Sequence, residues 1–273
     1  MRLRIFLRQP LAVAGLAVLL VLGIGSATAP LWTPFDPAGM NLRAMQQPPS
    51  PTHPLGTDDL GRDVLTRLLF AGRISLSLAL MVTAFSLLVG CTLGALAGFM
   101  GGWPDRLVTL AADTMLSIPA LALAMVAGSL LQPDLLTLSL VLAFVSWPEL
   151  ARIMRAQVLS LREHAFSEAA RALGASDGRV LFRHLVPNTL PPLIVAGTLL
   201  VAYVLLVESA LSFLGYGMRP PTPSWGGMLN ESQPFYRQAP WLAVFPGLAI
   251  TLTVTAINLV GDGLRAAAAG RGR

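Results

Sequence analysis

The sequence predicts an all-α, polytopic membrane protein with six transmembrane helices, because of its composition, its long apolar stretches and the distribution of its arginines. Of the 273 residues, 54% are hydrophobic and 12% are charged, whereas about a quarter of the residues in an ordinary soluble domain are charged. All 19 basic residues are arginine, so the chain lacks the lysine of a Walker A nucleotide site. Any ATP chemistry must therefore come from a partner.

Six stretches are apolar enough to cross a bilayer as helices, which takes about 20 residues each. The third contains Asp113, the fourth carries Glu149 near its expected cytoplasmic end, and the fifth contains Glu208. A carboxylate at mid-bilayer costs ~2.5–3.5 kcal/mol on insertion scales, so we expect these acids to face other helices, another subunit or water. The stretches cover residues 11–35, 74–104, 107–131, 135–154, 191–214 and 241–264.

The first apolar stretch follows three arginines and has Pro10 in its expected first turn, where proline is tolerated. A basic start, an apolar run and Ala27-Thr28-Ala29 also fit a cleaved secretory signal peptide. Pro30 directly after that site disfavours cleavage. We therefore predict a retained membrane helix.

Six helices place both chain ends on one side of the membrane, and the arginines indicate which side. Thirteen arginines fall on the side of the N-terminus and six on the other. Cytoplasmic loops carry the excess of positive charge, so we expect both termini in the cytoplasm. The thirteen are Arg2, Arg4, Arg8, Arg106, Arg152, Arg155, Arg162, Arg171, Arg179, Arg183, Arg265, Arg271 and Arg273; the six are Arg43, Arg62, Arg67, Arg73, Arg219 and Arg237.

These features divide the chain into four parts. Residues 1–31 form a cytoplasmic N-terminus and the first transmembrane helix, and residues 32–73 form a periplasmic segment. Residues 74–265 form a five-helix transmembrane core that includes a cytoplasmic loop, residues 156–187. Residues 266–273 form a cytoplasmic tail.

The cytoplasmic loop contains the polar sequence EHAFSEAARALGASDGRVLFRHLVP, residues 163–187. Its first half predicts a helix over 163–173 that ends at Gly174, since glycine adopts the left-handed conformation after a helix at little cost. Ser176 and Asp177 suit the start of a second short helix, which Pro187 should stop or kink. The loop therefore predicts two short helices joined at a glycine.

Glu168-Ala169-Ala170, followed by Gly174 and then by Val186-Pro187, resembles the EAA loop of permease subunits of binding-protein-dependent ABC importers. The family pattern has Ile where His184 stands and Leu where Val186 stands. Four other stretches are similar to signatures of the dipeptide, oligopeptide and nickel branch of these permeases. They cover residues 53–64 (HPLGTDDLGRDV), 72–76, 210–215 and 220–229 (PPTPSWGGML).

The resemblance implies a transport mechanism with an outside source of energy. Glu168 would make a polar contact in a groove of the ATPase, Ala169 and Ala170 would allow close approach, and Gly174 would set the angle between the two short helices, with Pro187 closing the loop. The implied partners are a second homologous permease subunit, two cytoplasmic ATPase subunits that bind ATP and Mg²⁺, and a periplasmic binding protein. The cargo would be a peptide or a related solute such as a nickel complex.

The periplasmic segment contains His53, Asp58, Asp59 and Asp63, which together suggest either a metal cluster or turn and cap residues. Arg62 among the carboxylates favours the second interpretation. We expect Thr57 or Asp58 to cap a short amphipathic helix over 60–70 on the outer face. The only cysteine, Cys91, lies in an apolar run, which excludes a disulfide within the chain and a cysteine-based metal site.

Glu208, Ser212 and Asp113 are the candidate residues of a translocation path. For Glu208, a hydrogen bond to Ser209, Ser212 or a neighbouring helix is the competing structural interpretation. A secondary transporter or channel working without an ATPase is the alternative function, for which these acids would be the ionisable residues. No catalytic constellation is recognisable, and nothing indicates a bound cofactor or nucleic acid.

Overall fold

The computed structural model describes residues 3–130 and 134–269 and is built of helices, with no β-strand in that part of the chain. Short 3₁₀ turns occupy Leu42–Ala44 and Gln233–Phe235, and a π-helical turn occupies Val180–Leu185. The α-helices are α1 (Leu3–Leu7), α2 (Pro10–Trp32), α3 (Val64–Met100), α4 (Gly102–Leu116), α5 (Ala120–Leu130), α6 (Leu135–Arg162), α7 (Ala165–Ala172), α8 (Asp177–Arg179), α9 (Val186–Phe213), α10 (Trp225–Ser232) and α11 (Trp241–Ala269).

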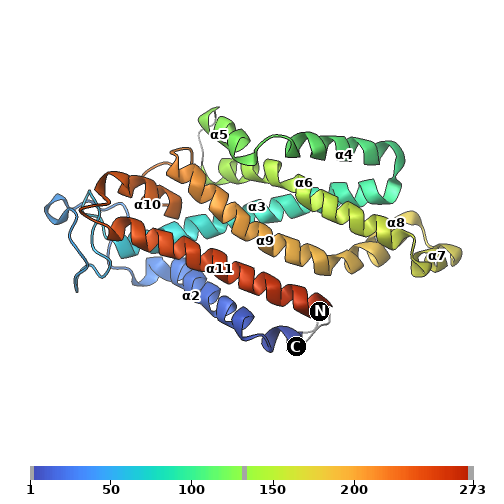
Figure 1. Cartoon of the computed structure of the whole chain (residues 1–273), viewed down its shortest axis with the longest axis horizontal. Helices are drawn as coiled ribbons and strands as arrows, with labels where there is room; N and C mark the ends of the chain where they lie inside the picture. Colours follow the sequence, from blue (N-terminus) through green and yellow to red (C-terminus); the bar gives the residue numbers. More distant parts are fainter. Residues whose placement is uncertain (1–2, 131–133, 270–273) are drawn as a thin grey trace.

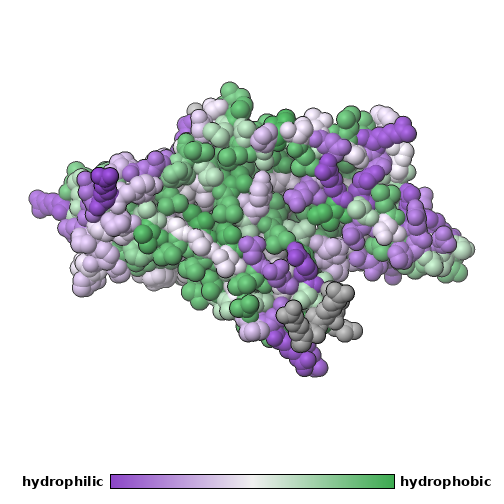
Figure 2. Space-filling view, viewed as in Figure 1, coloured by the Kyte–Doolittle hydropathy of each residue, from purple (hydrophilic) through white to green (hydrophobic). Residues whose placement is uncertain are grey.

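The long helices run roughly along one direction, with α3 between the others and α2 beside α11 (Figure 1). The segment 33–63 and α10 lie at one end of the bundle, and α7 projects from the other (Figure 1). Hydrophobic residues form a broad band between these ends, where hydrophilic residues gather (Figure 2). This distribution fits a bundle that crosses a bilayer with a polar cap on each side.

Five helices in the described residues are long and apolar enough to cross a membrane, and the count is six if α4 and α5 together form one span. That pair is bent by 83°. The bend falls at Ser117–Pro119, where proline supplies no amide hydrogen and disfavours a helical conformation in the residue before it. The expected span over 107–131 is therefore broken rather than straight.

The helix α3 begins at Val64, ten residues before the expected start of the second apolar stretch. Asp63 caps it by accepting a hydrogen bond from the amide of Thr66 at 2.8 Å. The prediction of a separate surface helix over 60–70, capped by Thr57 or Asp58, is therefore wrong. Gly72 lies inside α3, where the absence of a side chain allows Trp225 and Ser26 to approach the helix closely.

Pro187 does not end a second short helix as expected, because a continuous helical segment of 37 residues runs from Asp177 to Phe213. The π-helical turn Val180–Leu185 precedes the proline, which then falls at the start of α9. A missing amide hydrogen is tolerated in a first helical turn. The loop over 163–187 is therefore joined to α9 without a break.

Three glycines spaced four residues apart, Gly90, Gly94 and Gly98, lie where α3 packs against α6. A Cβ atom on Gly94 would stand 2.3 Å from the backbone oxygen of Ala151 and 2.9 Å from the Cβ of Met154. Small residues at such positions let the backbones of membrane helices approach closely. The α3–α6 contact therefore depends on the absence of side chains along this row.

We expect Gly94→Ala to destabilise the protein by about 1–3 kcal/mol, because the added methyl group overpacks the interface. Gly247→Ala is the matched control, since a Cβ there would meet nothing within 4 Å. Alanine favours a helix over glycine by up to about 1 kcal/mol, so the control should be neutral or stabilising. Thermal unfolding of both variants in detergent measures the difference, and equal melting temperatures would show that the close approach is unimportant.

Candidate functional site

The helix α7 ends in a Schellman motif at Gly174, as the sequence predicts. The amide of Ala175 donates to the oxygen of Ala170 at 3.0 Å, and the amide of Gly174 donates to that of Arg171 at 2.9 Å. Gly174 has φ of +82°, which side chains other than glycine's rarely adopt. The direction in which the chain leaves α7 is therefore set by this one residue.

An exposed apolar patch surrounds α7 at the tip of the bundle. Leu173 is 89% exposed, Phe182 is 67% exposed and Phe166 is 40% exposed. Phe166, Ala169, Ala170 and Leu173 border a hollow of about 420 Å³, which Arg179 and His184 also line. We call Phe166, Ala169, Ala170, Leu173 and Phe182 the loop patch. Contiguous apolar surface of this kind on an otherwise polar loop indicates a protein interaction site.

The predicted loop residues lie around this patch. Glu168 and Ala169 are exposed, Ala170 is half-buried, and Pro187 is exposed at the start of α9. Ser167 is buried below them, with its hydroxyl donating to the oxygen of Leu161 at 2.9 Å. The side chain of Glu168 is therefore available to a partner, and α7 is fixed to the end of α6.

The base of the loop is packed into the bundle. Val180, Leu181 and Leu185 are buried in one cluster with Met154 and Val158 of α6. Because interiors are closely packed and deform little, a displacement of the loop must move α6 and α9 with it.

Glu208, a predicted path residue, is fully buried. Its carboxylate accepts hydrogen bonds from the hydroxyl of Ser212 at 2.7 Å and from that of Ser75 on α3 at 3.2 Å. The hydroxyl of Ser75 also accepts from the amide of Trp225 on α10 at 3.3 Å. In this conformation Glu208 links three helices, as the structural interpretation expects, and its role in a path stays a prediction.

Of the other two candidate path residues, Ser212 contacts Glu208 and Asp113 lies apart from it. The hydroxyl of Ser212 accepts from that of Ser224 at 3.2 Å and borders a hollow of about 180 Å³ in the segment 215–231. Asp113 pairs with Arg152 of α6, and both side chains are about half exposed. The structure therefore brings Glu208 and Ser212 together and places Asp113 in a separate pair between α4 and α6.

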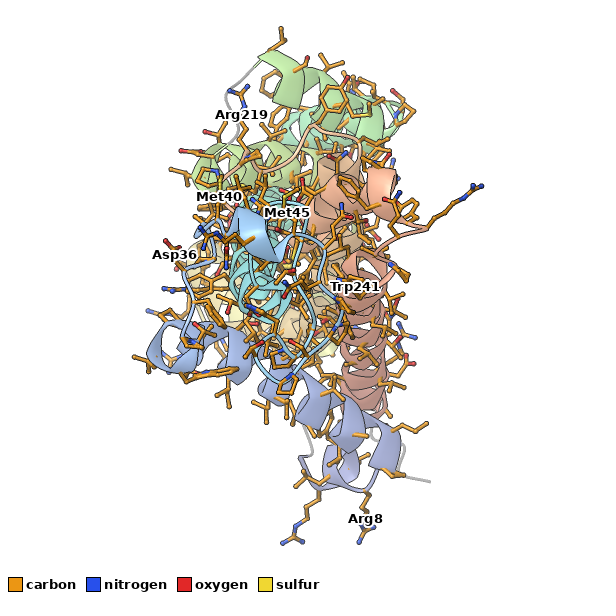
Figure 3. All side chains as sticks on the ribbon, turned by 90° about the vertical axis from the view of Figure 1, so that its left-hand side faces the viewer. Arg8, Asp36, Met40, Met45, Arg219 and Trp241 are labelled. Carbon is orange, nitrogen blue, oxygen red and sulfur yellow. The ribbon has the colours of Figure 1, made fainter. Side chains whose placement is uncertain are left out.

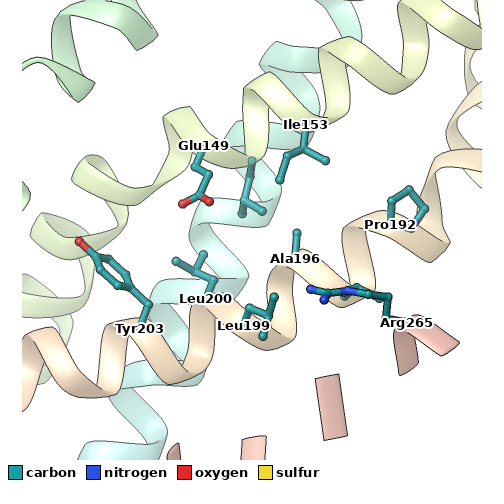
Figure 4. Close-up of a pocket in the computed structure, with 10 residues that line it drawn as sticks. Glu149, Ile153, Pro192, Ala196, Leu199, Leu200, Tyr203 and Arg265 are labelled. Atoms are coloured by element: carbon teal, nitrogen blue, oxygen red, sulfur yellow. The ribbon is translucent and has the colours of Figure 1, made fainter. Parts of the chain in front are cut away.

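Glu149 lies near the middle of its helix and not near the end as expected, because α6 continues to Arg162. It is exposed and makes no ion pair or side-chain hydrogen bond with the described residues. It opens instead onto a groove of about 440 Å³ between α6 and α9, with Arg265 of α11 at its edge (Figure 4). We call this the α6–α9 groove.

A buried ionic cluster joins the segment 33–63 to α3 and α10. The Arg67 guanidinium contacts Glu231 at 2.8 Å and Asp58 at 3.4 Å, and Arg62 contacts the same two carboxylates at 2.9 Å and 2.6 Å. Both arginine side chains are less than a tenth exposed. Asp58 also accepts hydrogen bonds from the amides of Leu60 and Arg62, as expected of a turn residue, and Glu231 adds a carboxylate from far along the sequence.

The remaining acids of this segment also have local partners. His53 Nδ1 lies 2.8 Å from the carboxylate of Asp63, and its ring stacks on Phe35. Within the described residues no group of three potential ligands could hold a metal ion. Figure 3 views this end of the bundle, with Asp36, Met40, Met45, Arg219 and Trp241 labelled. The polar end of the bundle is therefore held together by ion pairs and hydrogen bonds between its segments.

The fold and the loop define the class of protein, a multi-pass membrane subunit with a surface for another protein at one tip. Residues 90–271 match the family of the binding-protein-dependent transport system inner membrane component, and residues 1–49 match the N-terminal TM domain of oligopeptide transport permease C. The chain belongs to this family and is a permease subunit of a binding-protein-dependent importer in the inner membrane. The second match covers α2, whose retention as a first span stays a prediction.

Named relatives are similar over nearly the whole chain. The dipeptide transport system permease protein DppC of Alkalihalophilus pseudofirmus is 40% identical over 258 residues, which is 94% of this chain and 85% of that protein. The glutathione transport system permease protein GsiD of Pectobacterium atrosepticum is 39% identical over 264 residues, which is 96% of this chain and 87% of that protein.

Proposed function

We propose that this chain is the permease subunit of an ATP-driven importer of peptides. The loop patch carries the proposal, because it offers a partner an apolar contact with an exposed carboxylate, Glu168, beside it. The names of the relatives support a peptide cargo, since one is a dipeptide permease and the other a glutathione permease. Peptides are therefore preferred to the nickel complexes that the resemblance also allows.

The proposed assembly pairs this chain with a second homologous permease subunit, as a heterodimer, and with two ATPase subunits at the loop patch. The ATPase subunits bind the ATP and Mg²⁺, since this chain has no lysine for a Walker A loop. A periplasmic binding protein delivers the peptide to the opposite end, formed by the segment 33–63 and α10. The excess of arginines on the loop side supports cytoplasmic termini.

The proposed mechanism uses the continuity of the loop with α9. Closure of the ATPase dimer would move the loop patch, and the packed base of the loop would carry that movement to α6 and α9. Rigid-body movement of these helices would then open the path alternately to each side.

We expect the tagged chain to co-purify with an ATPase, and vesicles holding the complete complex to take up a dipeptide only with ATP and the binding protein. Leu173→Asp with Phe182→Asp should abolish co-purification, because two buried charges would remain unpaired at the contact. Leu206→Asn, at an exposed position on α9 away from the loop, is the control. Uptake by this chain alone, driven by an ion gradient, would contradict the proposal and support a secondary transporter.

A further inference from the structure

The α6–α9 groove lies within the part of the chain that crosses the membrane. Glu149 is about 21 Å from Leu135 along α6, at 1.5 Å per residue, and the hydrocarbon core of a bilayer is about 30 Å thick. The groove therefore reaches from the level of Glu149 toward the end of the bundle where Arg265 lies.

Glu149 requires an explanation that the single subunit does not provide. Its carboxylate points into the gap between α6 and α9 (Figure 4) and is exposed, with no cation beside it among the described residues. An acid at this depth costs ~2.5–3.5 kcal/mol unless it faces water or a partner. The α6–α9 groove therefore faces water, a bound group or a partner subunit rather than lipid.

The groove carries opposite charges along its length. Arg265 extends toward Ala196 in Figure 4, and its only ion pair in the described residues is with Asp262 at 3.6 Å, where both side chains are more than half exposed. Such exposed ion pairs contribute little free energy, so the guanidinium of Arg265 can exchange Asp262 for another anion. The hydroxyl of Tyr203 points toward α6 at the other end.

The walls between these charges are apolar and come from both helices. Ile153 on α6 faces Pro192, Ala196, Leu199 and Leu200 on α9. The volume of about 440 Å³ falls within the range of about 300–1,000 Å³ that is usual for small-ligand sites. A short peptide has an ammonium group at one end, a carboxylate at the other and variable side chains between them, which matches this order of charges and apolar surface.

We propose that the α6–α9 groove is a transit subsite for a zwitterionic short peptide, with the ammonium group at Glu149 and the carboxylate at Arg265. This inference rests on the proposed function. Tyr203 accepts or donates a hydrogen bond beside the ammonium end, and the apolar walls accept different side chains because they offer no directional contacts. The subsite thus recognises the two ends of the peptide and not its sequence.

The test uses the complete complex in lipid nanodiscs and a dipeptide of alanine and photo-leucine, whose diazirine forms a covalent bond on illumination. Three forms are compared: the free dipeptide, its N-acetyl derivative and its C-terminal amide. Mass spectrometry locates and quantifies the crosslinks on this chain. With the free dipeptide we expect them on Ile153 and Leu199.

Each charge should then respond only to the peptide end that it binds. Glu149→Gln should lower the crosslink yield of the free dipeptide and the amide about tenfold, the loss expected for one hydrogen bond to a charged group, and leave the N-acetyl form unchanged. Arg265→Gln should lower the free and N-acetyl forms and leave the amide unchanged. Arg237→Gln, exposed at the opposite end of the bundle, should change none.

Equal yields in all variants, or crosslinks confined to other helices, would overturn the subsite. Loss of the second permease subunit from the Glu149→Gln complex would overturn it too, because Glu149 would then be a subunit contact. ATP-driven uptake of the same dipeptide by the unaltered complex is measured in parallel. If that uptake is present while the crosslinks fail, the inference falls and the proposed function stands.

Discussion

Gly174→Val is expected to lower peptide uptake about tenfold while ATP hydrolysis by the complex continues. Valine is β-branched, and holding a residue of this kind at φ of +82° costs about 1–3 kcal/mol. The chain relieves that strain by leaving the left-handed conformation, which breaks the two hydrogen bonds that end α7. The orientation of α7, and of the loop patch on it, then changes relative to the bundle. Uptake into vesicles and phosphate release, measured on the same preparation, give the ratio of the two activities.

Gly178→Val is the matched control for this prediction. Added Cβ atoms at Gly174 and Gly178 both meet nothing within 4 Å, but only Gly174 has a positive φ. A difference in uptake between the two variants is therefore caused by the backbone conformation at Gly174 and not by a steric clash of the added side chain. If Gly174→Val retains full uptake per ATP hydrolysed, the angle between α7 and the following segment is not what couples the two activities.

Arg67→Ala is expected to lower the stability of the protein by about 3 kcal/mol. The guanidinium is 2% exposed, contacts Glu231 and Asp58, and donates to the oxygen of Pro37 at 3.2 Å. Removing one partner of a buried ion pair usually costs about 3–5 kcal/mol, and the lower value applies because the Glu231 side chain is 30% exposed and Arg62 still contacts it. Thermal unfolding in detergent should show a melting temperature lower by several degrees.

Arg73→Ala is the control for this prediction, since Arg73 lies on the same helix, is exposed, and has no ion pair within the described residues. It should leave the melting temperature within error of the unaltered protein. If both variants had the same melting temperature, the ionic cluster would not stabilise the packing of the segment 33–63 against α3 and α10.

The features that depend on local sequence could be predicted. The apolar stretches correspond to α2, α3, α6, α9 and α11, because spanning helices need long runs without charge. The end of α7 at Gly174 could be predicted because the residue types of a helix terminus are local. The family was recognisable from short motifs and is confirmed by the comparison with known proteins.

Features that depend on distant contacts or on competing local preferences could not be predicted. The apolar stretch that predicts α6 ends before Arg155, yet the helix continues to Arg162, with Arg155 paired to Asp105 of α4 and Val158 buried against the loop. The sequence therefore placed Glu149 too near the end of the helix. The contact of Arg67 with Glu231 joins residues 164 positions apart. Proline is common inside membrane helices, so Pro119 alone did not indicate a bend of 83°.

The unbroken helical segment from Asp177 to Phe213 has a mechanical consequence. Its 37 residues make a rod about 55 Å long at 1.5 Å per residue. Rotating such a rod by about 5° around one end sweeps the other through about 5 Å, comparable to one helical turn. A small rotation at the loop end is therefore amplified into a shift of several ångströms at the other end, where Ser212 contacts Ser224 at the start of α10. Contacts at one end of the bundle can thus respond to movement at the other through this helical segment alone.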